Sequence, residues 1–118
     1  MQIKVLKSKI HNATVTDHNL EYDGSVGIDP DLLDASGLSP YEKVHLLNIS
    51  NGERLETYAI KGKKGSGEIS IYGAAAHKIQ TGHKIIILAY GLIDDKDIES
   101  PLPKVIHLNS SNKIIWKK

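Results

Sequence analysis

The pair Asn51-Gly52 constrains the fold of this chain more than any other local feature. Asn-Gly is strongly preferred in two-residue β-hairpin turns, because both residues accept the left-handed backbone angles that such turns need. Residues 43–50 and 54–60, on either side of the pair, have the composition of strands. The sequence therefore predicts an antiparallel hairpin near its centre and a fold built mainly from β-strands.

Other segments add short strands and two small helices. Isoleucine dominates the aliphatic residues, with no Phe and a single Trp, which suits a small β-structure with an Ile, Val and Leu core. Residues 29–37 predict a helix, since Asp29 can cap it and Gly37 can end it. A second helix is expected at 74–79, and this pattern indicates a small barrel rather than alternating strands and helices. Further strands are expected at residues 2–7, 13–16, 25–28, 68–72 and 84–90, around 105–106 and around 114–115.

Composition bounds the kind of protein. The 118 residues form one expected domain, 1–118, and a net charge of +1 from 15 basic and 14 acidic residues argues against a nucleic-acid partner. The longest apolar run, Ile85–Tyr90, is too short to span a membrane, and the absence of cysteine is compatible with a cytoplasmic location. The six histidines lack metal-ligand spacing, so no metal is expected. The glycine-rich residues 62–67 lack the order of a phosphate-binding loop and predict a solvated hairpin loop.

The dipeptide Gly24-Ser25 lies at a turn between two extended segments. Glycine has no Cβ, so its peptide can adopt conformations that other residues resist. In such a turn the Ser25 Oγ can attack the Gly24 carbonyl and convert the amide to an ester. Elimination then splits the chain and leaves a dehydroalanine, which hydrolyses to a pyruvoyl group. Taken alone, a Gly-Ser pair is more often an ordinary turn.

Five short motifs, in order, carry a family resemblance. The motifs are Lys9-Ile10-His11, Leu20-Glu21-Tyr22-Asp23-Gly24-Ser25, Asn51-Gly52-Glu53-Arg54, Thr57-Tyr58-Ala59-Ile60 and Gly73-Ala74-Ala75-Ala76-His77. With these motifs, the chain resembles the pyruvoyl-dependent aspartate 1-decarboxylases from residue 1 to about Tyr90. The resemblance implies a six-stranded double-psi β-barrel that is cut between Gly24 and Ser25 into fragments 1–24 and 25–118.

The resemblance also implies a reaction and a cofactor. Ser25, once converted to a pyruvoyl group, forms a Schiff base with L-aspartate, and the α-carboxylate leaves as CO2 to give β-alanine for pantothenate biosynthesis. This carbonyl takes the role that pyridoxal phosphate has elsewhere, so neither that cofactor nor a metal is expected. Members of the family are homotetramers with sites at subunit interfaces. The sequence identifies no maturation factor.

Roles for individual residues follow from the same resemblance. Tyr58 is the implied proton donor, and Thr57 is implied to support ester formation at Gly24. From the residues alone, Tyr58 is as well explained as an aromatic packed at a barrel rim, and His11 as a packing histidine. The small residues 73–75 would equally suit a helix packed on a sheet. The implied substrate-binding residues are Lys9, His11, Arg54, Thr57, Gly73, Ala74 and Ala75.

Arg54 is the only arginine in the chain. Its planar guanidinium matches a carboxylate better than lysine does, although a surface ion pair with Glu53 or Glu56 is the alternative. The departing carboxylate becomes neutral CO2, so an ion pair to it would stabilise the ground state and slow the reaction. We therefore expect Arg54, helped by Lys9, to hold the carboxylate that stays on the product.

The chain departs from the family pattern near the expected site. Tyr72 stands where Asn is common, and it would crowd the pocket, alter maturation or point elsewhere. Leu47 replaces an aromatic residue found in several relatives, and Asp23 replaces the commoner Glu. These changes leave two alternatives open: decarboxylation of a longer acidic amino acid, and a barrel that never matures and serves as a binding module.

Overall fold

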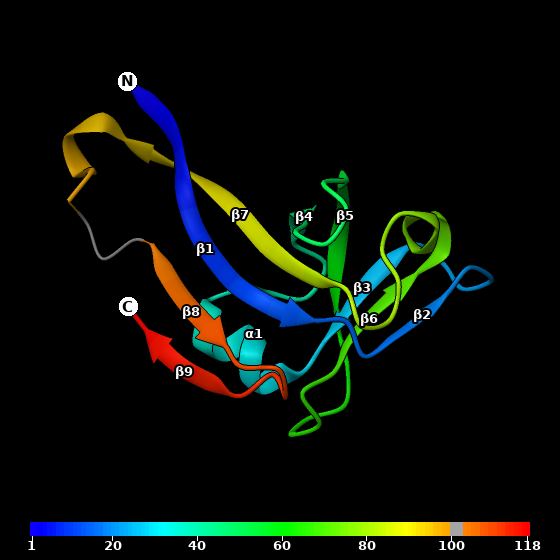
Figure 1. Ribbon diagram of the computed structural model, residues 1–118. Helices are drawn as coiled ribbons and strands as arrows, with labels where there is room; N and C mark the ends of the chain where they lie inside the picture. Colours follow the sequence, from blue (N-terminus) through cyan, green and yellow to red (C-terminus); the bar gives the residue numbers. More distant parts are fainter. Residues whose placement is uncertain (100–102) are drawn as a thin grey trace.

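The computed structural model describes residues 1–99 and 103–118 and has a mainly β fold (Figure 1). Within these residues lie nine strands, one α-helix and two 3-10 helices. The helices are α1 (Pro30–Ser36), η1 (Gly73–His77) and η2 (Asp95–Asp97). The strands are β1 (Gln2–Thr14), β2 (Asp17–Asn19), β3 (Ser25–Ile28), β4 (Lys43–Asn48), β5 (Arg54–Lys61), β6 (Ile69–Tyr72), β7 (Lys84–Asp94), β8 (Lys104–Leu108) and β9 (Ile114–Lys117). The expected mainly β class with short helices is confirmed.

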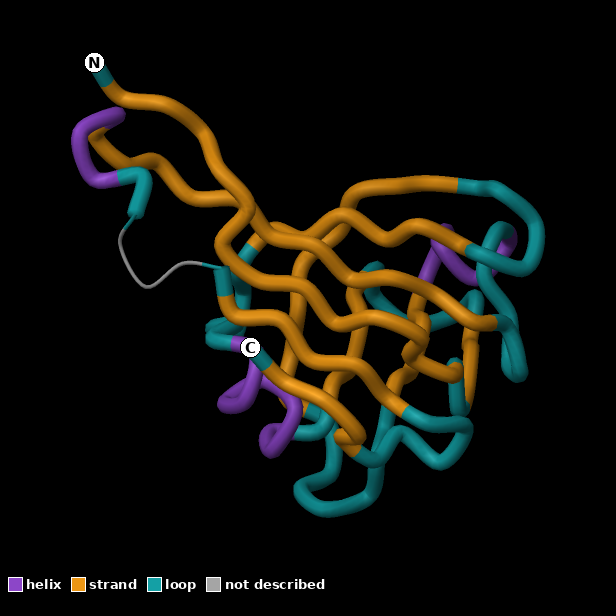
Figure 2. The backbone as a smooth tube through the Cα atoms, turned by 60° about the vertical axis from the view of Figure 1, so that its left-hand side comes forward, coloured by secondary structure: helices purple, strands orange, loops and turns teal. Residues whose placement is uncertain are grey.

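Six central strands follow one another in the order β6-β3-β5-β4-β7-β1. The backbone view shows that the strands form a strongly curved sheet (Figure 2). Just after β1, the Thr16 N–H donates to the Ile69 carbonyl of β6 at 2.8 Å and brings the two ends of this order together. β2 adds to the order beside β6, and β8 and β9 add to it beside β1. This order and this contact are compatible with the expected small barrel of six strands, beside which three short strands are added.

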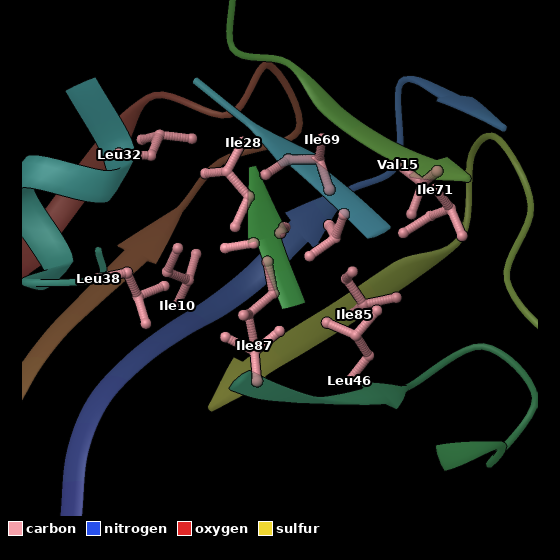
Figure 3. Close-up of a cluster of buried hydrophobic side chains, with 14 of the residues drawn as sticks. Ile10, Val15, Ile28, Leu32, Leu38, Leu46, Ile69, Ile71, Ile85 and Ile87 are labelled. Atoms are coloured by element: carbon pink, nitrogen blue, oxygen red, sulfur yellow. The ribbon is translucent and has the colours of Figure 1, made fainter. Parts of the chain in front are cut away.

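The core is formed by aliphatic side chains inside the ring of strands (Figure 3). Ile10, Ile28, Leu46, Ile69 and Ile87 come from five different strands and are completely buried. Burying such a side chain contributes about 1.5–3 kcal/mol relative to leaving it exposed. Because successive residues of a strand point to opposite faces, the residues that directly precede and follow each core residue point away from the core.

The predicted hairpin is confirmed. β4 and β5 pair antiparallel, but residues 49–53 connect them rather than a two-residue turn. Gly52 has a φ of 79°, whereas Asn51 does not adopt the left-handed angles that the pair was expected to share. The expectation for residues 62–67 was wrong in one respect. They connect β5 to β6, but these strands are not hairpin partners, because β3 lies between them. A local sequence pattern cannot reveal that a distant strand is inserted between two neighbours.

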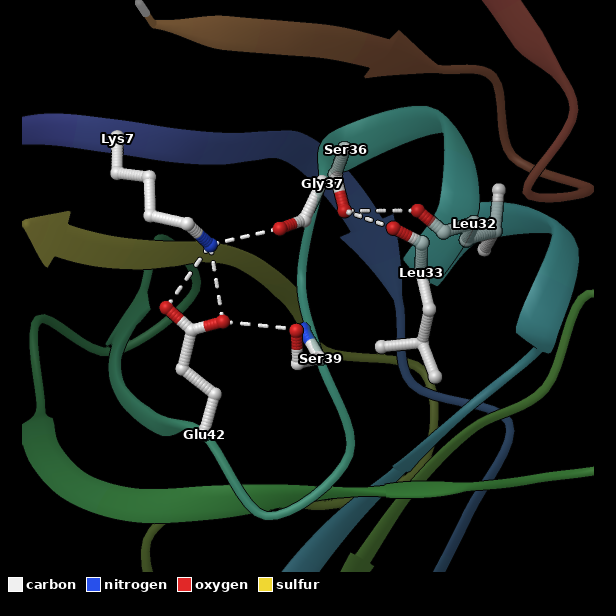
Figure 4. A network of polar contacts seen from close by, with 7 residues as sticks. All are labelled: Lys7, Leu32, Leu33, Ser36, Gly37, Ser39 and Glu42. Carbon is white, nitrogen blue, oxygen red and sulfur yellow. Dashed lines mark hydrogen bonds and ion pairs between the residues drawn. The ribbon is translucent and has the colours of Figure 1, made fainter.

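Helix α1 ends as the sequence predicts, and its end is tied to β1. Gly37 follows the helix with a φ of 73°, which favours glycine. The Lys7 ammonium donates to the Gly37 carbonyl at 2.6 Å and pairs with the Glu42 carboxylate at 2.9 Å (Figure 4). Glu42 also accepts from the Ser39 N–H at 3.0 Å. This half-buried network fixes the path from α1 into β4.

Some boundaries differ from those expected. β1 runs without interruption from Gln2 to Thr14, so residues 13–16 do not form a strand of their own. A register shift after Ile10, with Asn12 at a φ of 64°, bends this long strand. The second expected helix is the shorter 3-10 turn η1. No helix of the described residues is long and apolar enough to cross a membrane.

Candidate active site

The Gly24-Ser25 bond lies where a turn enters the barrel, because β3 begins at Ser25. β3 runs parallel to β5 on one side and antiparallel to β6 on the other. Ser25 pairs with Tyr72 of β6 and is only 3% exposed. Its hydroxyl donates to the Asp23 carbonyl at 3.3 Å. The hydroxyl beside the expected cleavage point is therefore buried and oriented by its own turn.

A pocket of about 280 Å³ opens beside Gly24. Thr57 borders it from β5, where the residue pairs with the buried Val44 and so faces the inside of the barrel. Ala74 and Ala75 of η1 border it from the other side and leave room because their side chains are small. The structure therefore brings four of the expected residues together. The pocket is lined by Gly24, Leu55, Glu56, Thr57, Ala74, Ala75 and Lys78.

Gly73 contacts the Gly24 segment directly. A Cβ placed on Gly73 would lie 2.6 Å from the Gly24 Cα, which no folded protein tolerates without movement. Gly24 itself is less constrained, since its φ is not left-handed and a Cβ there would meet no atom closer than 3.9 Å. The expectation that Gly24 supplies the unusual backbone was therefore wrong. The residue that requires glycine is Gly73.

Tyr58 lies on the strand next to Ser25. The next residue, Ala59, pairs with Val26, and both side chains are completely buried in the core. Because neighbouring residues of a strand point to opposite faces, Tyr58 and Ser25 point away from the core, and Ser25 is nevertheless covered there by other residues. The Tyr58 ring is 37% exposed and stacks on Tyr41, with centroids 6.5 Å apart and planes 29° apart. Thr57 and Tyr58 therefore point to opposite faces of β5, and Tyr58 is level with Ser25 in the strand register. Sequence reasoning missed Tyr41, which no local pattern connects to Tyr58.

Arg54 and Lys9 lie on the outer face, and neither is among the residues that line this pocket, although Leu55, next to Arg54, is one of them. Arg54 starts β5, about 13 Å before Tyr58 at the usual rise per residue. Lys9 is on β1, three strands away, or about 14 Å at the usual spacing. Glu53 pairs with Lys78 and Glu56 with Lys43, so within residues 1–99 and 103–118 neither forms an ion pair with Arg54. One chain therefore does not bring all the expected residues together.

His11 belongs to an aromatic cluster on the same outer face. Its ring lies 4.8 Å from that of His107, which in turn lies 4.8 Å from Trp116. Burial first, and then the charges of His107 and Lys9, lower the pKa of His11 below its usual 6.5. Its buried Nδ1 has no hydrogen-bond partner in the described part of the chain. His11 is therefore expected to be uncharged at neutral pH.

The unusual Tyr72 points away from the pocket. Its hydroxyl donates to the Glu68 carboxylate at 3.4 Å, and its ring lies 5.3 Å from that of Tyr22. Gly27 makes room for it, because a Cβ there would lie 3.3 Å from the Tyr72 ring. Tyr72 does not line the pocket at Gly24. Of the three outcomes considered for this residue, the structure agrees with the last.

The described residues contain no cluster of three or more His, Cys, Asp or Glu side chains suited to a metal ion. Their fold and site define a small, mainly β protein with a pocket beside a glycine that is followed by a buried serine. The model of the aspartate decarboxylase family matches residues 1–115. The chain belongs to this family, and the match extends past Tyr90, where the motif resemblance ended.

Individual relatives agree with this assignment. The chain is 53% identical to the aspartate 1-decarboxylase of Carboxydothermus hydrogenoformans, over 98% of this chain and 91% of that protein. It is 51% identical to the enzyme of the same name from Caldicellulosiruptor saccharolyticus, over 98% of this chain and 90% of the relative. The corresponding protein of Ralstonia pickettii is 51% identical, over 97% and 95% of the two chains. The resemblance drawn from the motifs is confirmed.

Proposed function

We propose that this protein removes the α-carboxylate of L-aspartate to give β-alanine and CO2, and so supplies pantothenate biosynthesis in the cytoplasm. Membership of the aspartate decarboxylase family supports the reaction. The observation that carries the proposal in this chain is the buried Ser25, placed directly after Gly24 at the edge of a small pocket. The alanine walls of this pocket suit a substrate as small as aspartate.

The proposed cofactor is a pyruvoyl group made from Ser25 by cleavage into fragments 1–24 and 25–118. The residues present are compatible with this origin, since the Ser25 hydroxyl follows the bond to be cut and donates to the Asp23 carbonyl, and a pocket borders Gly24. Once formed, the group supplies a carbonyl that takes up the electron pair released with CO2. Thr57 is proposed to donate a hydrogen bond to the Gly24 carbonyl, and its position beside Gly24 in the pocket lining supports this role.

The remaining roles belong to charged and phenolic side chains. Arg54 is proposed to hold the carboxylate that the product keeps, with Lys9 adding positive charge. Tyr58 is proposed to hold the proton that replaces CO2 on carbon, because it lies on the strand next to Ser25. An uncharged His11 would pack on the outer face without a positive charge that repels Lys9.

The assembly is proposed to be a homotetramer whose sites form between subunits. The support is geometric: Gly24, Thr57, Ala74 and Ala75 line one pocket within one chain, whereas Lys9, His11 and Arg54 are not part of its lining. A second copy that presents its outer face to the pocket would complete the site. Exposed apolar residues such as Tyr41 and Tyr90 would be covered in such an assembly.

Intact mass of freshly purified and then warmed protein tests the proposal, combined with product analysis on aspartate and glutamate. We expect two fragments that match 1–24 and 25–118, the larger one carrying a ketone at its N-terminus. We also expect β-alanine as the product from aspartate. Borohydride with aspartate should add mass to the larger fragment only. A chain that stays whole and inactive would favour a binding module, and turnover of glutamate alone would favour the longer substrate.

A further inference from the structure

Gly73 and Gly24 face one another across two strand ends. Ser25 pairs with Tyr72 in the antiparallel β3–β6 register, so the next position sets Gly24 opposite Gly73. A Cβ on Gly73 would lie 2.6 Å from the Gly24 Cα, 2.8 Å from the Gly24 nitrogen and 3.0 Å from the Tyr22 carbonyl oxygen. All three are backbone atoms, which cannot rotate aside as the end of a side chain can. The Tyr22–Gly24 segment therefore rests directly on the Gly73 backbone.

Gly73 also sets the position of the pocket wall. Its φ of 75° lies in the left-handed region, and it is the first residue of η1. The next two residues, Ala74 and Ala75, line the pocket beside Gly24. Gly73 thus fixes both the position of the Tyr22–Gly24 segment and the start of η1, whose alanines line the pocket beside Gly24.

We propose that Gly73 is a positioning residue for self-cleavage, an inference that rests on the proposed function. Its missing side chain lets the Tyr22–Gly24 segment settle where the Gly24 carbonyl meets the Ser25 hydroxyl. In that step the Ser25 Oγ bonds to the Gly24 carbonyl carbon, the peptide C–N bond breaks, and the hydroxyl proton passes to the Ser25 nitrogen. No further reactant is consumed, so geometry governs the rate of this rearrangement.

The size of the contact sets the expected effect. To move a Cβ at Gly73 from 2.6 Å to an ordinary contact of 3.4 Å, the Gly24 segment must shift by about 0.8 Å. A displacement of this order costs roughly 100-fold in rate when two groups react within a fixed frame. Gly73→Ala is therefore expected to slow chain cleavage by about 100-fold.

The chain offers matched controls at Gly52 and Gly82. Both have a left-handed φ, 79° and 90°, and a Cβ at either would meet nothing within 4 Å. Gly52→Ala and Gly82→Ala therefore introduce the backbone strain of Gly73→Ala without its contact. Cleavage is followed by intact mass as purified precursor is warmed, and folding by circular dichroism and thermal melting. Gly73→Ala should have a melting temperature close to those of the two control variants. Its Gly24-Ser25 bond should stay intact under conditions in which the controls are cleaved.

Hydroxylamine gives a second readout, because it cleaves esters and leaves Gly24 as a hydroxamate on fragment 1–24. The wild type and the controls should yield this fragment, and Gly73→Ala should not, since its ester does not form. Cleavage of Gly73→Ala at the rate of the controls would overturn the inference and leave the proposed function intact. An uncut wild type would instead remove the proposed function, and the inference with it.

A folding defect has its own test. If Gly73→Ala does not fold, Gly73→Asn replaces it, with Gly82→Asn as control, because Asn accepts left-handed angles better than other residues. A folded but uncut Gly73→Asn supports the positioning role. Failure of both Gly73 variants to fold, while the Gly82 variants fold, would make Gly73 a folding requirement and overturn the inference.

Discussion

The carboxylate of Asp29 joins the start of α1 to the loop between β5 and β6. It is 4% exposed and accepts backbone N–H groups from Asp31 at 2.9 Å, Gly65 at 3.0 Å and Gly67 at 2.8 Å. Burial alone would raise its pKa, but the three N–H groups, with Lys64 nearby, hold the pKa below the usual 3.8. The sequence predicted the helix cap. It did not predict the two loop contacts, which depend on the tertiary fold.

Asp29→Asn should lower the free energy of unfolding by about 2 kcal/mol at pH 7, because charge-assisted bonds to buried N–H groups are lost. The folded pKa lies below the unfolded one, so this stabilisation is complete above the unfolded value near 3.8 and is lost as the pH falls through the folded pKa. Urea unfolding at neutral and strongly acidic pH should show the deficit shrink. Asp31→Asn, at an exposed ion pair with Lys64, is the control and should change little. An Asp29→Asn deficit independent of pH would contradict the assignment.

Arg54→Lys should raise the KM for aspartate by at least about tenfold, because lysine loses a two-pronged, charge-assisted contact to the retained carboxylate. Chain cleavage should proceed as in the wild type, since Arg54 starts β5 about 13 Å from Tyr58. Steady-state kinetics and intact mass on the same preparation measure both effects. Impaired cleavage with an unchanged KM would assign Arg54 to maturation instead.

At the scale of elements, local chemistry predicted the hairpin at Asn51-Gly52 and the helix α1 well. Both depend on residues within a few positions of one another, so their signals are present in the sequence. The insertion of β3 between β5 and β6, and the contact of Gly73 with Gly24, depend on residues about 30 to 50 positions apart. Position in the family motif placed Thr57 at the site, but only the strand register shows that Thr57 and Tyr58 approach from opposite faces.

The turn between β8 and β9 is fastened to the barrel by Asn112. This side chain is 4% exposed, donates to the carbonyls of Thr14 at 2.8 Å and Gly67 at 2.7 Å, and accepts from the Thr14 N–H at 2.8 Å. Asn112 therefore links three segments that are distant in sequence. Without it, buried backbone groups of β1 and of the 62–67 loop would lose their partners.

Asn112→Ala should cost about 2–3 kcal/mol of unfolding free energy, because several buried polar groups are left unsatisfied. Asn109→Ala is the matched control, since in the described part of the chain the Asn109 side chain accepts hydrogen bonds from Ser111 and Lys113 of the same turn and from no other residue. Urea unfolding of the two variants should show a clearly smaller loss for Asn109→Ala. Equal losses would mean that the turn itself, rather than its attachment, carries the stability.

At the scale of the whole molecule, the expected site residues divide into two groups. If the pocket of one copy is completed by the outer face of another, chains with Ser25→Ala and chains with Arg54→Ala should restore activity when co-expressed. Random mixing would give roughly a quarter of the sites an intact residue of each kind. Activity of the mixed sample, compared with each variant alone, measures this. An inactive mixture would place both residues of each site in one chain.

The position of β1 affects how the cleaved protein can refold. It lies between β7 and β8, and the proposed cut would separate it covalently from both. Fragment 1–24 would remain bound without a covalent link, because the backbone hydrogen bonds of β1 to β7 and β8 would hold it in place. An unfolded mature enzyme would then have to reassemble from two separate partners, so recovery from heat should weaken on dilution, whereas the uncut precursor can refold alone.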